Sequence, residues 1–100
     1  MVVFSHGAYG IRFQSIFFTQ YLASHGYVVP APDHQDNTLY DLFAEDGYNI
    51  DDMGWSAVER PYDAAAVIDR MLERNATPGD TFAGSVDPDR IGMSGHSFGG

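Results

Sequence analysis

Residues 95–100 of the chain read Gly95-His96-Ser97-Phe98-Gly99-Gly100. This run fits the pattern G-x-S-x-G, in which a serine lies on a sharp turn between a β-strand and an α-helix, with its hydroxyl lifted out of the sheet. The residues before it, 90–94, are typical of a short strand that leads into such a turn. Gly95 and Gly99 leave room for the turn, and Gly100 lets a following helix approach. We therefore interpret Ser97 as a nucleophile; an ordinary glycine-rich turn is the alternative.

Upstream of this turn, the sequence predicts a β-α-β unit. The apolar run 1–5 ends at His6-Gly7 and is typical of a strand buried on both faces. Apolar residues recur at helical spacing over 13–24, and Gly26 can take the left-handed turn that ends a helix. Residues 27–31 form a second strand-like run, stopped by Pro32. We expect parallel strands joined by right-handed crossover helices, in three α-β-α layers.

The segment 36–52 is acidic and contains no Lys or Arg. Its carboxylates are Asp36, Asp41, Glu45, Asp46, Asp51 and Asp52. A calcium-binding loop needs oxygen ligands at regular spacing around a central glycine, and residues 46–51 do not follow that pattern. We expect a solvated excursion with one short helix.

A stronger helix is predicted after this excursion. Pro61 suits a first-turn position, and Arg60 and Asp63 are interpreted as capping and packing residues at the helix start. One helical face is apolar; it comprises Ala64, Val67, Ile68, Met71 and Leu72. The breaker pair Pro78-Gly79 marks the end of the helix.

A serine hydroxyl becomes an effective nucleophile only with an adjacent base, an acid that orients the base, and donors for the oxyanion that forms. The loop after the first strand and the turn at Ser97 should open on the same edge of a parallel sheet. We therefore assign the oxyanion donors to the backbone amides of Ala8 and Phe98, with Tyr9 as the alternative to Ala8. We expect Tyr9 and His96 to border a substrate pocket.

The other histidines are given structural roles. His6 ends the first strand, where hydrogen bonding to neighbouring loops is favoured over proton transfer. His34 lies between Asp33 and Asp36, a composition that suits either a loop network or a metal or acid-base cluster; we favour the loop network. We predict neither a metal nor an organic cofactor.

Composition narrows the class of protein. The chain is 44% hydrophobic, which is typical of a packed globular protein. Its formal net charge of −9 argues against nucleic acid as a partner, because nucleic-acid binding needs a cationic face. The absence of cysteine excludes disulfides and a cysteine nucleophile. No apolar run approaches the roughly 18 residues of a membrane helix. The compartment and the oligomeric state cannot be read from the sequence.

Taken together, these motifs resemble the α/β-hydrolase superfamily. Within it, the chain is similar to the branch of predicted dienelactone hydrolases, platelet-activating-factor acetylhydrolases and cutinase-like polyester hydrolases. The matching runs are 2–7, 22–29, 87–92 and 95–100, and Arg60-Pro61-Tyr62-Asp63 is similar to a helix start in the predicted dienelactone hydrolases. True dienelactone hydrolases have a cysteine where this chain has Ser97.

The resemblance implies a serine esterase that acts on a small-molecule or lipid-like ester. In this superfamily the acid and the histidine follow the serine along the chain, so both are expected beyond Gly100. Residues 1–100 are accordingly expected to be the N-terminal and central part of a single domain, incomplete at both ends and inactive by themselves. A serine peptidase of the same fold and a non-catalytic binding protein are the alternatives.

Overall fold

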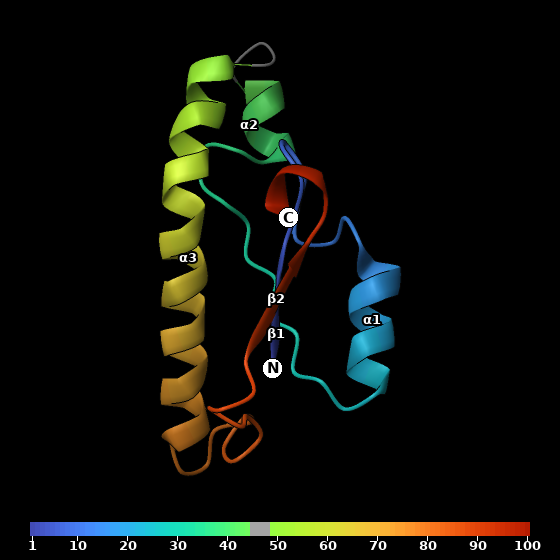
Figure 1. The fold of residues 1–100 in the computed structure, drawn as a ribbon, viewed down its shortest axis with the longest axis vertical. Helices are drawn as coiled ribbons and strands as arrows, with labels where there is room; N and C mark the ends of the chain where they lie inside the picture. Colours follow the sequence, from blue (N-terminus) through green and yellow to red (C-terminus); the bar gives the residue numbers. More distant parts are fainter. Residues whose placement is uncertain (45–48) are drawn as a thin grey trace.

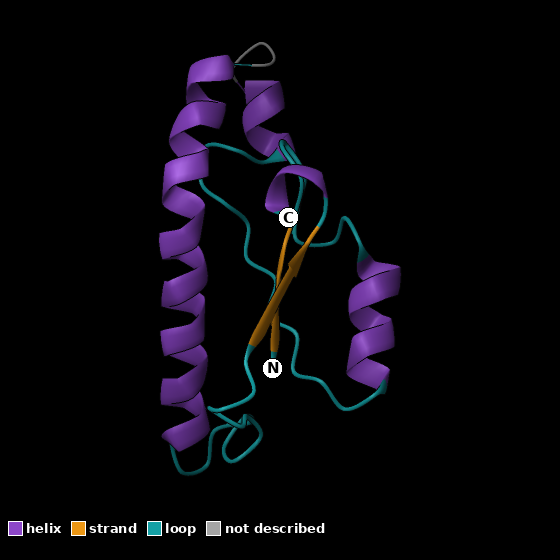
Figure 2. Ribbon diagram, in the orientation of Figure 1, coloured by secondary structure: helices purple, strands orange, loops and turns teal. Residues whose placement is uncertain are grey.

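The computed structural model describes residues 1–44 and 49–100. Two strands, β1 (Val2–Ser5) and β2 (Gly92–Gly95), lie between helices α1 (Ile16–Ser24) and α3 (Ile50–Ala76). Figure 1 shows α3 on one face of the strands and α1 on the other, with the short α2 (Leu39–Ala44) near the end where the strands finish. The layers follow the order helix, strands, helix (Figure 2). This is a small parallel α/β arrangement, as expected.

Strands β1 and β2 are parallel neighbours. Val2 is opposite Gly92 and Ser5 is opposite Gly95. The pairing continues past β2, where the amide of His96 donates to the carbonyl of Ser5 at 3.1 Å. Because both strands run the same way, the loops that follow them leave the sheet at the same edge.

The strand predicted over 27–31 is not a regular strand in the structure. The segment lies along the other side of β1, whose Val2 and Phe4 amides donate to the carbonyls of Val28 and Pro30 at 3.0 and 2.9 Å. A parallel ladder would need the amides of residues 30 and 32 to donate back, and both residues are prolines, which have no N–H. β1 is therefore an inner strand, while the segment beside it makes only half of a ladder.

Helix α1 begins at Ile16, later than predicted, and it turns a different face inward. Phe13, Phe17 and Tyr21 are 61%, 76% and 62% exposed. Phe18 instead packs on Phe4 of β1, with ring centroids 5.9 Å apart. The helix is apolar around most of its circumference, so its sequence pattern did not identify the face that meets the sheet.

Helix α3 begins at Ile50, well before the predicted start at Pro61, and spans 27 residues. Its N-cap is Asn49, whose side chain accepts the amide of Asp51 at 3.0 Å. Two carboxylates in the first turn, Asp51 and Asp52, complement the positive end of the helix dipole. Pro61 therefore lies inside the helix. The one short helix expected in the acidic excursion is α2, while Glu45, Asp46 and the start of the rejected calcium-loop pattern lie outside the described residues.

The apolar face predicted for this helix is confirmed. Met71 of α3 packs with Met1, Val3 and Val86 in the main core cluster. Partly buried residues of the same face surround that cluster; they are Val67, Ile68 and Leu72. Among the described residues, no helix has the length and apolar character needed to cross a membrane.

Candidate functional site

Ser97 lies immediately after β2, on a backbone turn that serine rarely adopts. Its φ angle is +52°, in the left-handed region, and it begins a short 3₁₀ helix, Ser97–Gly99. The residue is exposed. A non-glycine residue in this region costs on the order of 1–2 kcal/mol, so the surrounding structure must impose the conformation.

The flanking glycines explain how the turn is imposed. A Cβ atom on Gly95 would lie 2.0 Å from the carbonyl oxygen of Gly99, and one on Gly99 would lie 2.2 Å from the carbonyl oxygen of Ser5. Only glycine fits at these two positions without a backbone shift. A Cβ on Gly100 would meet nothing nearer than 3.4 Å, so this glycine has no such steric role among the described residues. The turn thus lies directly against the end of β1.

The loop after β1 forms the other side of this edge. The Tyr9 amide donates to Oδ1 of Asn37 at 3.3 Å, and the Tyr9 hydroxyl pairs with the backbone N–H and C=O of Asn49 at 2.9 and 3.1 Å. In the described part of the chain, the amides of Ala8 and Phe98 donate to no other group. The engaged amide of Tyr9 and the free amide of Ala8 favour Ala8 as the donor from this loop, an assignment that remains a prediction.

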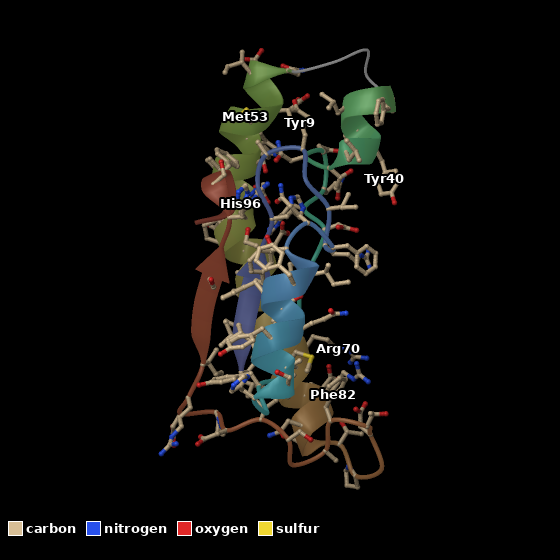
Figure 3. The ribbon with its side chains drawn as sticks, turned by 90° about the vertical axis from the view of Figure 1, so that its right-hand side faces the viewer. Tyr9, Tyr40, Met53, Arg70, Phe82 and His96 are labelled. Carbon is tan, nitrogen blue, oxygen red and sulfur yellow. The ribbon has the colours of Figure 1, made fainter. Side chains whose placement is uncertain are left out.

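The two residues expected to border a substrate pocket lie at the same end of the molecule (Figure 3). Tyr9 is only 8% exposed and is held by Asn37 and Asn49. His96 is exposed, and its Nδ1 would lie 3.1 Å from a Cβ placed on Gly7. The imidazole of His96 therefore lies against the loop that follows β1. A pocket role for either residue remains a prediction.

Backbone strain is concentrated at this edge. Three non-glycine residues among those described have positive φ angles: Tyr9 at +51°, Asp36 at +58° and Ser97 at +52°. Tyr9 follows β1, Asp36 follows the extended segment 27–31, and Ser97 follows β2. Strained residues of this kind cluster at functional sites, so the strain supports this edge as the candidate site.

Beneath the edge lies a buried cation, Arg60 of α3, which is 7% exposed. Its side chain donates to five acceptors: Ser56 Oγ, Ser5 Oγ, Asn37 Oδ1 and the carbonyls of His6 and Gly7. The distances to Ser56, Ser5, Asn37 and Gly7 are 3.1, 3.2, 2.7 and 3.3 Å. The guanidinium also stacks on the ring of Phe98, 4.8 Å from its centroid. Arg60 thus contacts both the loop after β1 and the turn that carries Ser97.

A second buried array joins Ser5, His34 and Asp63. His34 Nε2 lies 2.9 Å from Ser5 Oγ, and His34 Nδ1 lies 2.7 Å from Asp63 Oδ2. Because a carboxylate only accepts hydrogen bonds, we assign the imidazole proton to Nδ1, so Nε2 accepts the Ser5 hydroxyl. The backbone amide of His34 donates to Nε2 of His6 at 3.1 Å. His34 is thus hydrogen-bonded to β1 and α3 as well as to His6, so the network extends beyond the loops in which it was expected.

This array has the connectivity of a Ser-His-Asp triad, and it borders a cavity of about 280 Å³ that Phe98 and Gly99 also line. Two observations argue against Ser5 as the nucleophile. Ser5 is 5% exposed, and Arg60 donates to the oxygen that would have to attack. A lone pair held by a guanidinium is a poorer nucleophile than one activated by a base alone. Ser97 is exposed by comparison.

The buried histidines predict acid sensitivity. Burial lowers the pKa of His6 and of His34 below the ordinary value of 6.5, and the charge of Arg60 lowers both pKa values further. A hydrogen bond to Gly7 raises the pKa of His6, and one to Asp63 raises the pKa of His34, but neither reverses the shift. Below pH 6.5 the unfolded chain binds protons that the folded chain excludes, so the free energy of unfolding should fall as the pH drops from 6.5 toward the lowered pKa values. The expected slope is up to about 1.4 kcal/mol per pH unit for each histidine.

Urea denaturation of the complete gene product at pH 7.5 and 5.5 measures this slope. His34→Gln should flatten it, whereas the matched change at the exposed His25, His25→Gln, should not. Equal slopes in the wild type and His34→Gln would contradict this account.

Sequence reasoning missed the role of Arg60 and Asp63, which were placed at a helix start. In the structure both lie well inside α3, and they contact the loops that follow the strands. One signal could have revealed Arg60: Ser56, Arg60 and Ala64 are spaced i, i+4, i+8 and continue the buried face toward the N-terminus. Reading Pro61 as a helix start concealed that continuation.

Residues 1–49 match the family model of platelet-activating factor acetylhydrolase, isoform II. The matched segment covers β1, α1 and α2 and includes Ala8 and His34, but it ends before Arg60 and Ser97. No curated protein and no solved structure matches the chain. Over this segment, the match supports a likeness to the acetylhydrolase branch of the α/β hydrolases.

Proposed function

We propose that this chain supplies the nucleophile and the oxyanion site of a serine hydrolase that cleaves carboxylic esters. The observation that carries the proposal is the conformation of Ser97, an exposed serine held at φ +52° at the end of β2. The unengaged amides of Ala8 and Phe98 support it, as does the match of residues 1–49 to an acetylhydrolase family.

In the proposed reaction, Ser97 Oγ attacks the ester carbonyl carbon and its proton passes to a histidine expected beyond Gly100. The carbonyl oxygen becomes an oxyanion, to which the amides of Ala8 and Phe98 donate. The tetrahedral intermediate collapses, and the alcohol leaves with the proton from the histidine. Water then attacks the acyl-enzyme by the same route, which releases the carboxylic acid and restores the serine hydroxyl.

Labelling with a fluorophosphonate tests the proposal. This reagent phosphonylates an activated serine and releases fluoride. After treatment of the complete gene product, peptide mapping by mass spectrometry should find the adduct on Ser97. An adduct on Ser5 would move the nucleophile to the buried array. A folded protein without any adduct would favour a non-catalytic binding protein.

The same preparation separates an esterase from a peptidase of the same fold. We expect turnover of p-nitrophenyl acetate and none of a proline p-nitroanilide. Cleavage of the anilide at a comparable rate would contradict the assignment to esters.

A further inference from the structure

We infer that Arg60 is a positioning residue for the oxyanion site, because it holds the peptide group that carries the Ala8 amide. The inference deepens the proposed function and rests on it. Arg60 belongs to α3, more than fifty residues from Ala8 in the sequence, and lies outside the segment that matches the acetylhydrolase family.

The first step is the peptide group itself. The carbonyl of Gly7 and the amide of Ala8 belong to one planar trans unit, in which C=O and N–H point in opposite directions. Fixing the direction of the Gly7 carbonyl therefore fixes the direction of the Ala8 N–H. Three groups donate to that carbonyl: His6 Nδ1 at 2.7 Å, the Gly10 amide at 3.0 Å and Arg60 at 3.3 Å. The Ala8 amide is thus directed away from these donors, and it has no acceptor of its own among the described residues.

The second step is the match between donors and acceptors. A guanidinium carries five N–H groups, and Arg60 makes five contacts with oxygen acceptors. Four of the acceptors belong to residues beyond α3: Ser5, His6, Gly7 and Asn37. A lysine ammonium has three donors and no planar fork, so it cannot make the same set.

The third step connects the second oxyanion donor. The Arg60 guanidinium stacks on the ring of Phe98, whose amide is the other proposed donor. Arg60 therefore contacts Phe98, which carries one donor amide, and the Gly7–Ala8 peptide group, which carries the other. A shift of Arg60 changes the separation of the two donors, and misplacement by about 1 Å can lower a rate by about 100-fold.

The fourth step is the charge. Among the described residues no carboxylate forms an ion pair with Arg60, although its side chain is buried. All five acceptors are neutral. Burial lowers the pKa of Arg60, and the negative charge of Asp63 offsets this only in part, so the cation is costly to bury. It lies across the Gly7–Ala8 peptide group from the expected oxyanion. Its field favours the oxyanion over the neutral ester.

The experiment compares two arginine-to-lysine variants in the complete gene product, Arg60→Lys and Arg70→Lys. Arg70 is exposed on the same helix, at the far end from the site (Figure 3), and provides the matched control. For p-nitrophenyl acetate, Arg60→Lys should lower kcat by about 10- to 100-fold with KM within about threefold, because a displaced oxyanion donor affects the transition state more than ground-state binding. Arg70→Lys should match the wild type in both constants.

A second variant keeps the test decisive if Arg60→Lys does not fold. Asn37→Asp preserves the Oδ1 acceptor for Arg60 and Tyr9 but places a negative charge beside the guanidinium. The carboxylate should draw the guanidinium away from the Gly7 carbonyl and toward residue 37, so we expect kcat to fall by about tenfold in a variant that still unfolds cooperatively. A wild-type kcat in folded Arg60→Lys overturns the inference, as does a wild-type kcat in Asn37→Asp if Arg60→Lys is unfolded. If the wild type itself does not hydrolyse the ester, the proposed function fails and the inference falls with it.

Discussion

Replacing Ser97 with alanine should lower ester hydrolysis by the complete gene product by at least about 1,000-fold, because the proposed mechanism has no other nucleophile. The free energy of unfolding should change by less than about 0.5 kcal/mol, since the side chain is exposed and alanine has a Cβ like serine in the same left-handed conformation. Initial rates with p-nitrophenyl acetate and urea denaturation measure the two quantities.

Ser5→Ala is the informative comparison for Ser97→Ala. It leaves one Arg60 donor and His34 Nε2 without a partner in a buried site, so it should cost about 1–3 kcal/mol of stability. The serine whose removal abolishes turnover without unfolding the protein is the nucleophile. Full activity in Ser97→Ala would refute our assignment.

Gly99→Ala should reduce the free energy of unfolding by more than about 3 kcal/mol. Its Cβ would lie 2.2 Å from the Ser5 carbonyl oxygen and 2.4 Å from that of His6, and neither backbone atom can move without disturbing β1. Overpacking in a fitted site typically costs about 1–3 kcal/mol, and a backbone clash exceeds that range.

Gly100→Ala is the control for this prediction, because a Cβ there meets only ordinary contacts, the nearest at 3.4 Å. It should change the free energy of unfolding by less than about 1 kcal/mol. Comparable losses in the two variants, measured by urea denaturation, would show that the turn does not pack against β1 in this way.

The parallel α/β arrangement could be predicted from the sequence because its strands are short apolar runs and its glycines fall at turns. The edge that unites the loop after β1 and the turn at Ser97 also followed from parallel topology alone. The strand over 27–31 was mispredicted because an apolar pattern carries no information about backbone hydrogen bonds. Pro30 and Pro32 have no N–H to donate to β1, so the ladder does not form.

The candidate site was predictable only where it depends on local sequence. Gly95 and Gly99 are required because of close contacts with residues near Ser97 or at the end of β1. The Arg60 network joins segments separated by 23 to 55 residues, and such contacts leave no local periodicity to detect. Pro61 added to the difficulty, because a proline inside a long helix has the same local signature as a proline in its first turn.

That internal proline divides α3 into two parts with different cooperativity. Pro61 has no N–H for the carbonyl of Ala57, so the backbone ladder of the 27-residue helix is interrupted one residue after Arg60. The C-terminal part is fastened to the core through Ala64 and Met71, whereas the N-terminal part buries only Ser56 and Arg60 and otherwise depends on its cap. We expect residues 50–60 to open and reclose more readily than residues 62–76, so their amides should exchange faster in native-state hydrogen exchange.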